Sequence, residues 1–217
     1  MLLLAFDTAS PTVTVAVHDG TDVIAEAVSE QTMRHGEELA PLISALLADA
    51  HAAPADLTAI AVGVGPGPFT GLRVGLVTAR TLGHVLGVPV HGVCSLDALA
   101  LEAAHERDEA IGGGFAVATD ARRKEVYLAR YDAAGRRRSD PVVDKPAVLA
   151  TDDPVVGEGA ALYPESFPAA RGPSRPSAGW LARGVVAATV ALGAPDPMYL
   201  RRPDAEARPA RTASVRP

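Results

Sequence analysis

The chain has 217 residues, with 20 Lys and Arg against 26 Asp and Glu, and a formal net charge of −6. This length allows one large domain or two small ones with an ample core. The negative charge argues against binding nucleic acid through the overall electrostatic field, so contact with RNA is expected to need a partner.

Composition also limits the compartment. Cys94 is the only cysteine, so no intrachain disulfide can form, as is typical of a reducing compartment. The first six residues are too few and too uncharged for a signal peptide, and the apolar run at 184–194 is too short to span a bilayer. The chain is expected to be cytoplasmic and soluble, with no membrane partner.

Strands dominate the first part of the chain. A meander of three strands joined by short turns is predicted at Leu2–Asp7, Val13–Asp19 and Asp22–Ser29. A helix over Glu37–Ala50 follows, since its apolar residues recur at the helical period, and a fourth strand is predicted at Ala59–Gly63. These apolar helix positions are Leu39, Leu42, Ile43, Leu46, Leu47 and Ala50.

A glycine-rich stretch from Gly63 to Gly75 joins the fourth strand to the next helix. The Walker phosphate loop needs a lysine, and no lysine precedes Lys124. The dinucleotide pattern places its third glycine at Pro68 or Thr70, and proline donates no backbone N–H. A phosphate-binding loop is therefore the less favoured interpretation.

The helix after Thr70 carries small residues at every fourth position: Gly71, Gly75, Ala79 and Gly83. Glycine costs roughly 1 kcal/mol relative to alanine inside a helix, so this small-residue stripe calls for a compensating contact. Two uses stay open, because the spacing serves both: packing on the chain's own sheet or helices, and docking of a second chain's helix. The apolar residues predicted to flank the stripe are Leu72, Leu76, Val77, Leu82 and Leu86.

The later elements define the fold class. A strand at Pro89–Cys94 and a helix from Ser95 to about Arg107 follow, so that a meander is succeeded by strand–helix crossovers. This order predicts an α/β protein with mixed sheets flanked by helices, in the actin-like ATPase (ribonuclease H-like) arrangement. A hairpin at Phe115–Thr119 and Glu125–Tyr131 and a last helix at Ser177–Leu192 are predicted next.

Composition changes suggest the boundaries of the parts. Glycines at 112–114 indicate a junction between a first lobe at residues 1–108 and a second lobe at 112–193. Residues 194–217 contain five arginines, three acidic residues and five prolines, a composition typical of an extended tail.

Catalytic patterns are weak throughout. No two histidines lie three or four residues apart, Cys94 has no second cysteine, and no Gly-x-Ser-x-Gly motif occurs, so no catalytic, cofactor or metal site is predicted. Asp7 ends the first strand, where such folds place a metal or phosphate carboxylate, but capping of the following turn is the favoured role. The basic run Arg136-Arg137-Arg138 is interpreted as a solvated loop rather than an RNA contact.

Six blocks along the chain resemble the bacterial TsaB (YeaZ) family. They are residues 4–9, 35–43, 65–75, 95–99, 120–127 and 199–201. The block at 65–75, Gly-Pro-Gly-Pro-Phe-Thr-Gly-Leu-Arg-Val-Gly, is the most specific, and the Asp120-Ala121-Arg122-Arg123 hairpin reinforces it in the same order.

The resemblance implies a non-catalytic dimerisation or scaffold subunit of the complex that places threonylcarbamoyl on the adenosine beside the anticodon of tRNA. Its implied partners are the transferase subunit TsaD and the ATPase TsaE, with tRNA bound only through the complex, and a homodimer of the isolated chain stays open. The resemblance also implies an actin-like fold of two related lobes, the second reduced, and a pairing surface formed by first-lobe helices. Carried onto this chain, the expected interface comprises Leu39, Leu42, Gly71, Leu72, Gly75, Leu76, Ala79 and Gly83.

Two other classes compete with the scaffold. An active actin-like ATPase or sugar kinase needs phosphate loops that this chain offers only in part, and a metallopeptidase, the less favoured of the two, needs a metal or nucleophile. The catalytic relative binds metal through a His-x-x-x-His helix, whereas His35 here is followed four residues later by Leu39. The sequence therefore favours the scaffold.

Overall fold

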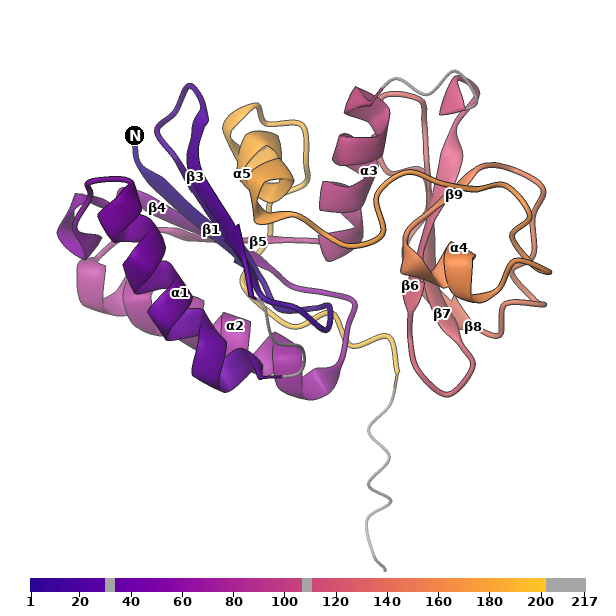
Figure 1. Cartoon of the computed structure of the whole chain (residues 1–217), viewed down its shortest axis with the longest axis horizontal. Coiled ribbons are helices and arrows are strands. Elements are labelled where there is room, and N and C mark those ends of the chain that lie inside the picture. The colour runs from indigo at the N-terminus through magenta and orange to yellow at the C-terminus, as the bar shows by residue number, and fades with distance from the viewer. Residues whose placement is uncertain (30–33, 107–110, 202–217) are drawn as a thin grey trace, which may run out of the picture.

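The computed structural model describes residues 1–29, 34–106 and 111–201, and it folds into two lobes, each built on a five-stranded sheet (Figure 1). Two mixed sheets flanked by helices are the predicted architecture, which is confirmed.

The sheet of the first lobe has the strand order β3-β2-β1-β4-β5. Its strands are β1 (Leu3–Asp7), β2 (Thr14–His18), β3 (Val23–Val28), β4 (Ala59–Gly63) and β5 (Val90–Val93). The first three pair antiparallel as a meander, and β4 and β5 then add in parallel on the other side of β1. Every residue of β1, β2 and β4 is buried, because helices cover both faces.

Helices α1 (His35–Asp49) and α2 (Phe69–Leu86) lie side by side on one face of this sheet. Helix α5 (Ala178–Val186) covers the other face, where Leu181 packs with Leu3 and Ala5. Between α1 and β4 stands a short 3-10 turn at Pro54–Asp56. Among the described residues no helix has the length and apolar character that crossing a membrane requires.

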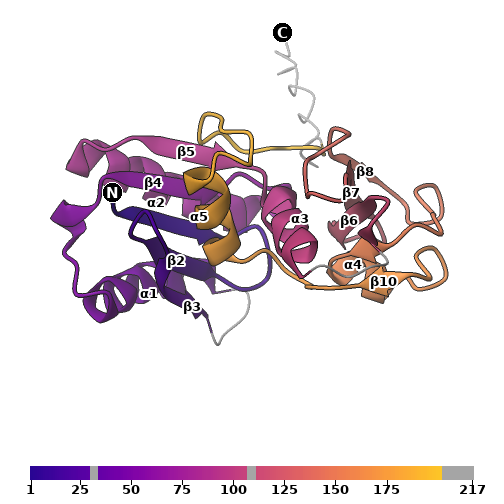
Figure 2. The same ribbon diagram turned by 90° about the horizontal axis from the view of Figure 1, so that it is seen from above.

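The second lobe is smaller and its sheet has the order β10-β9-β6-β7-β8. Strands β6 (Phe115–Asp120) and β7 (Val126–Tyr131) pair as the predicted hairpin, and both lie inside the sheet, because β8 covers the edge that β7 would otherwise form. The remaining elements are short: β8 (Val142–Asp144), β9 (Val155–Val156), α4 (Glu158–Leu162) and β10 (Ala170–Arg171). Helix α3 (Ser95–His105) lies between α5 and the second sheet (Figures 1 and 2).

The lobe boundaries differ from the expected ones at the C-terminal end. The sequence order assigns residues 178–186 to the second lobe, but α5 packs on the first sheet, with Ala178 N–H donating to Thr14 Oγ1 at 3.1 Å. The part of the expected tail that the structure describes, residues 194–201, runs back across the first lobe. The rest of that tail, 202–217, lies outside the described residues.

One residue of the basic run at 136–138, Arg137, has a structural role that the interpretation as a solvated loop did not include. Asp97 at the start of α3 accepts a hydrogen bond from Tyr131 Oη at 2.8 Å and lies 3.6 Å from Arg137 Nε. Burial raises the pKa of Asp97, and the Arg137 guanidinium acts against that rise. Arg138 pairs with Asp132 at 2.7 Å. Arg137 thus ties the second lobe to α3, while Arg136 and Arg138 remain exposed.

Candidate functional site

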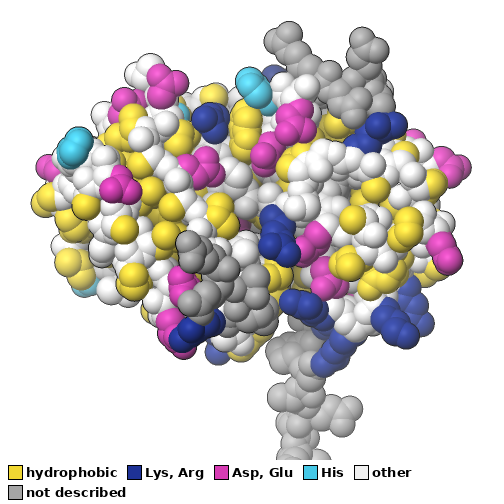
Figure 3. Space-filling view, viewed as in Figure 1, with side chains coloured by type: hydrophobic (Ala, Val, Ile, Leu, Met, Phe, Trp, Pro, Cys, Tyr) yellow, Lys and Arg dark blue, Asp and Glu magenta, His cyan; other side chains and the backbone are white. Residues whose placement is uncertain are grey.

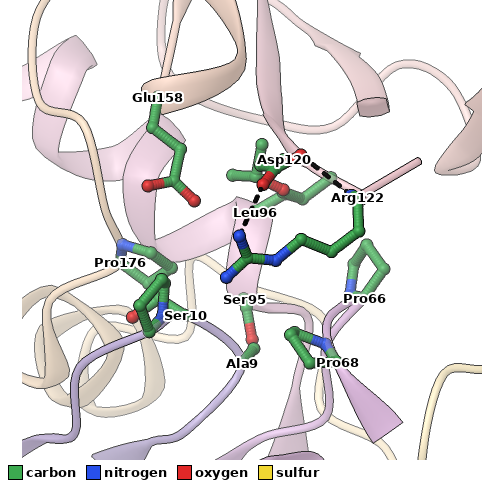
Figure 4. Close-up of a pocket in the computed structure, with 12 residues that line it drawn as sticks. Ala9, Ser10, Pro66, Pro68, Ser95, Leu96, Asp120, Arg122, Glu158 and Pro176 are labelled. Atoms are coloured by element: carbon green, nitrogen blue, oxygen red, sulfur yellow. Dashed lines mark hydrogen bonds and ion pairs between the residues drawn. The ribbon is translucent and has the colours of Figure 1, made fainter. Parts of the chain in front are cut away.

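A narrow pocket lies where the two lobes meet, at the ends of β1 and β4 (Figure 4). The first lobe contributes Ser10, Pro66 and Pro68, and the second contributes Asp120, Arg122 and Glu158. The space it encloses is about 10 Å³, close to the minimum that a single water molecule needs. The enclosed part of the pocket is therefore about the size of one water molecule.

Asp7 lies beside this pocket, at the end of β1, and is buried. Its Oδ1 accepts the Ala9 N–H at 2.6 Å, and its Oδ2 accepts the Ser95 hydroxyl at 2.5 Å. Burial raises the pKa of Asp7, and the bond from Ser95 opposes that rise. Both carboxylate oxygens are thus occupied by the chain itself, which confirms the predicted capping role.

The charged groups that line the pocket are paired within the second lobe. Asp120 Oδ1 accepts the Arg122 N–H at 2.8 Å, and the Arg122 guanidinium extends across the pocket to lie 3.4 Å from Asp120 Oδ2 (Figure 4). Glu158 accepts a hydrogen bond from Arg175 Nε at 3.1 Å. The turn that carries Arg122 holds three consecutive non-glycine residues at positive φ, namely Arg122, Arg123 and Lys124.

Metal-binding chemistry finds no support in the described part of the chain. It contains no group of three or more His, Cys, Asp or Glu side chains placed to hold a metal ion. His35, for which the sequence offers no second histidine four residues later, is buried, and its Nε2 lies 2.7 Å from the Ser10 carbonyl oxygen. Its ring therefore joins α1 to the turn after β1.

The second candidate site is the predicted partner interface, and the small-residue stripe proves to face inward. Added Cβ atoms at Gly71 and Gly75 would clash with Thr8, and one at Gly83 would clash with Val90. The first of the two uses left open by the spacing is therefore correct, and the expectation of a bare docking groove is wrong. The buried members of the predicted interface are Leu39, Gly71, Leu72, Gly75, Leu76, Ala79 and Gly83, and Leu42 is half-buried.

The opposite side of α2 is open to solvent and carries large apolar side chains. Phe69, Val77 and Val85 are 45%, 61% and 73% exposed. On neighbouring α1 the exposed residues are small or acidic, among them Ala40, Ala45 and Glu37. Together these residues form what we call the outer face of α1 and α2. Isolated apolar side chains are common on surfaces, but several on one helix indicate a contact surface.

The two helices of this face differ in charge. Helix α1 contains Glu37, Glu38 and Asp49 and no Lys or Arg, whereas α2 contains Arg73 and Arg80 and no acidic residue. A partner built on a similar helix pair could therefore meet it with complementary charge.

Sequence reasoning missed the part played by residues 193–201, although the block Tyr199-Leu200-Arg201 belonged to the resemblance. The Tyr199 ring stacks on Phe69 with centroids 5.3 Å apart. A run rich in proline and arginine carries no helical or strand period, so this contact had no signal in the pattern.

Comparison with known proteins agrees with the observed fold and with the six sequence blocks that resemble the TsaB (YeaZ) family. Residues 22–168 match the family model described as TsaD: tRNA N6-adenosine threonylcarbamoyltransferase. An uncharacterized protein of Mycobacterium tuberculosis is 44% identical over 217 residues, which cover 94% of this chain and 93% of the relative. The tRNA threonylcarbamoyladenosine biosynthesis protein TsaB of Bacillus subtilis is 35% identical over 150 residues, 69% of this chain and 63% of that protein.

A solved structure is similar over most of the chain. The structure described as YeaZ from Pseudomonas aeruginosa has a TM-score of 0.74 and 30% sequence identity, covering 92% of this chain and 99% of that one. The fold is that of the actin-like ATPases, with a reduced second lobe. The chain belongs to the TsaB (YeaZ) family.

Proposed function

We propose that this chain is the non-catalytic scaffold subunit of the complex that forms threonylcarbamoyladenosine in tRNA. Its relatives named TsaB are described as tRNA threonylcarbamoyladenosine biosynthesis proteins, which supports the reaction. One observation carries the non-catalytic role: the carboxylate that an actin-like enzyme would direct at metal or phosphate is buried here and accepts hydrogen bonds from the Ala9 N–H and the Ser95 hydroxyl. The pocket beside it holds about one water molecule.

The partner in this proposal is the catalytic transferase subunit TsaD, docked on the outer face of α1 and α2. The exposed apolar residues of α2 and the small side chains of α1 support the proposal, since a flat face allows close helix approach. The ATPase TsaE would join this pair, and tRNA would bind through the complex, because this chain carries a net charge of −6. The complex is expected in the cytoplasm.

The isolated chain could use the same face to pair with itself. A two-fold arrangement would set acidic α1 of one copy against basic α2 of the other. Such a homodimer would compete with TsaD for the same surface. Adding the transferase subunit should therefore dissociate the homodimer and form heterodimers.

Reconstitution tests the proposed function. Purified transferase, ATPase, threonylcarbamoyl-adenylate and unmodified tRNA should form threonylcarbamoyladenosine only when this chain is added. The chain alone should turn over no ATP. Steady ATP hydrolysis by the isolated chain that disappears in Asp7→Ala would instead support an active actin-like ATPase.

A further inference from the structure

Residues Gly193–Arg201, which we call the strap, cross the junction between the lobes in a fixed position (Figure 1). Gly193 exchanges two backbone hydrogen bonds of 2.9 Å with Gly92, and the Met198 N–H donates to the Val64 carbonyl oxygen at 2.8 Å. Arg80 of α2 donates to the Pro195 carbonyl oxygen at 2.6 Å and forms an ion pair with Asp196.

The end of the strap reaches the second lobe. The Met198 side chain packs against the apolar cores of both lobes, and Arg201 forms an ion pair with Glu125, just before β7. Lys and Arg side chains gather along the junction of the lobes and the lower edge of the second lobe (Figure 3). The strap is therefore held from both sides of Tyr199, which limits the positions that this side chain can take.

Tyr199 belongs to a cluster of three exposed side chains at the first turns of α2. Its ring is stacked on Phe69 at 5.3 Å, and the Arg73 guanidinium lies 3.7 Å from the centre of the Phe69 ring. Arg73 Nε donates to the Tyr199 hydroxyl at 3.4 Å. Phe69 and Tyr199 are 45% and 43% exposed, and no ion pair between Arg73 and a carboxylate occurs among the described residues. We call these three residues the aromatic–arginine cluster.

We infer that the aromatic–arginine cluster is the principal binding contact for the transferase subunit and receives an acidic, partly apolar segment of it. This inference rests on the proposed function. The cluster continues the outer face of α2, because Phe69 and Arg73 stand on the same helix as Val77. Tyrosine and arginine are enriched among the residues that dominate binding energy. The Arg73 guanidinium already lies over the Phe69 ring, and a carboxylate of the partner would supply the opposite charge that it does not meet within the described residues.

The strap adds to the expected affinity because it orders Tyr199 before the partner arrives. A side chain already immobilised by its own fold loses less conformational entropy on binding. An unpaired RNA base could also stack on such rings. The protein partner is favoured because the cluster adjoins the apolar outer face, and RNA is an outcome of the test.

Calorimetric titration of the full chain with the purified transferase subunit tests the inference. Tyr199→Ala should weaken binding at least tenfold, while Tyr199→Phe, which keeps the stacked ring, should bind within about threefold of the unaltered chain. The matched control is Leu192→Ala, which removes a side chain of similar exposure just before the strap. Tyr199→Phe and Leu192→Ala should melt like the unaltered chain, and Tyr199→Ala, which loses the stack on Phe69, should stay fully folded at the temperature of the titration.

The outcomes separate this inference from the proposed function. If Val77→Asp abolishes binding but Tyr199→Ala leaves the Kd unchanged, the outer face binds the partner and the inference is wrong. If Tyr199→Ala keeps the partner Kd but loses tRNA cross-linking in the assembled complex, the cluster binds RNA and the inference is wrong. If the unaltered chain does not bind the transferase at all, the proposed function fails and the inference with it.

Discussion

The two sides of helix α2 differ in the size and the exposure of their side chains. The inner side carries the small-residue stripe, and a Cβ added at Gly71 or Gly75 would clash with Thr8, and one at Gly83 with Val90. The outer side carries Phe69, Val77 and Val85, whose side chains are exposed to solvent. The side of α2 that carries only small residues therefore packs closely inside this chain. The opposite side of α2 exposes apolar side chains that a partner could bury.

Replacing a residue of the inner side should produce the largest loss of stability. Gly75→Leu places a branched side chain against the Thr8 hydroxyl, which itself donates to the Gly71 carbonyl oxygen. Overpacking of this kind costs about 3 kcal/mol, and for a chain of this size the melting temperature should fall by about 10 °C. Thr81→Leu, on the outer side, is the control and should melt like the unaltered protein. Equal melting temperatures would show that the stripe is not packed as described.

Asp7 resembles the small-residue stripe in that it is buried and contacts groups of its own chain. Asp7→Ala leaves the Ser95 hydroxyl without its acceptor and the Ala9 N–H buried and unpaired. Unfolding in urea should show a loss of about 2 kcal/mol. Asp22→Ala, at an exposed turn, should leave the urea midpoint unchanged. A fully stable Asp7→Ala protein would contradict a structural role for this carboxylate.

Much of the first lobe could be predicted from its sequence, for physical reasons. The fourth strand was predicted at its observed bounds, Ala59–Gly63, and β1 and α1 within one or two residues, because the two strands are short apolar runs and α1 has a clear helical apolar period. The stripe of α2 was also found, but spacing alone does not say what lies against it. That depended on Thr8, which is distant in sequence.

Errors arose where single long-range contacts decide the structure. Helix α5 lies on the first sheet through Thr14, which chain order does not reveal. Strands β9 and β10 have two residues each and show no period. The strap has the composition of a tail, and its place depends on bonds to Val64, Gly92 and Arg80.

A smaller effect is expected at α3, which is covered by α5. Glu102 Oε2 is buried and, among the described residues, has no hydrogen-bond partner. Burial, with Glu106 and Glu26 nearby, raises the pKa of Glu102 to about 7, while Arg183 lowers it. The folded chain thus keeps a proton that the unfolded chain has lost, so this carboxyl makes stability fall as pH rises from about 4.5 to 7.

Glu102→Gln should remove that dependence. At pH 8 the variant should be more stable by about 1 kcal/mol, a figure reduced for solvent screening because the group is partly exposed, and at pH 4.5 the two proteins should unfold alike. Glu165→Gln, at an exposed position, is the control. Thermal melts across this range check the prediction, and a constant difference at every pH would exclude titration of Glu102 as the cause.

The most direct test of docking without catalysis is threonylcarbamoyladenosine formation by the reconstituted complex with two altered chains. Val77→Asp puts a charge on the outer face of α2, and Arg122→Ala removes the side chain that crosses the pocket between the lobes. We predict that Val77→Asp lowers the rate at least tenfold at limiting concentration and regains it when the chain is in excess, while Arg122→Ala retains the full rate. Loss of activity in Arg122→Ala at every concentration, with Val77→Asp unaffected, would contradict the account.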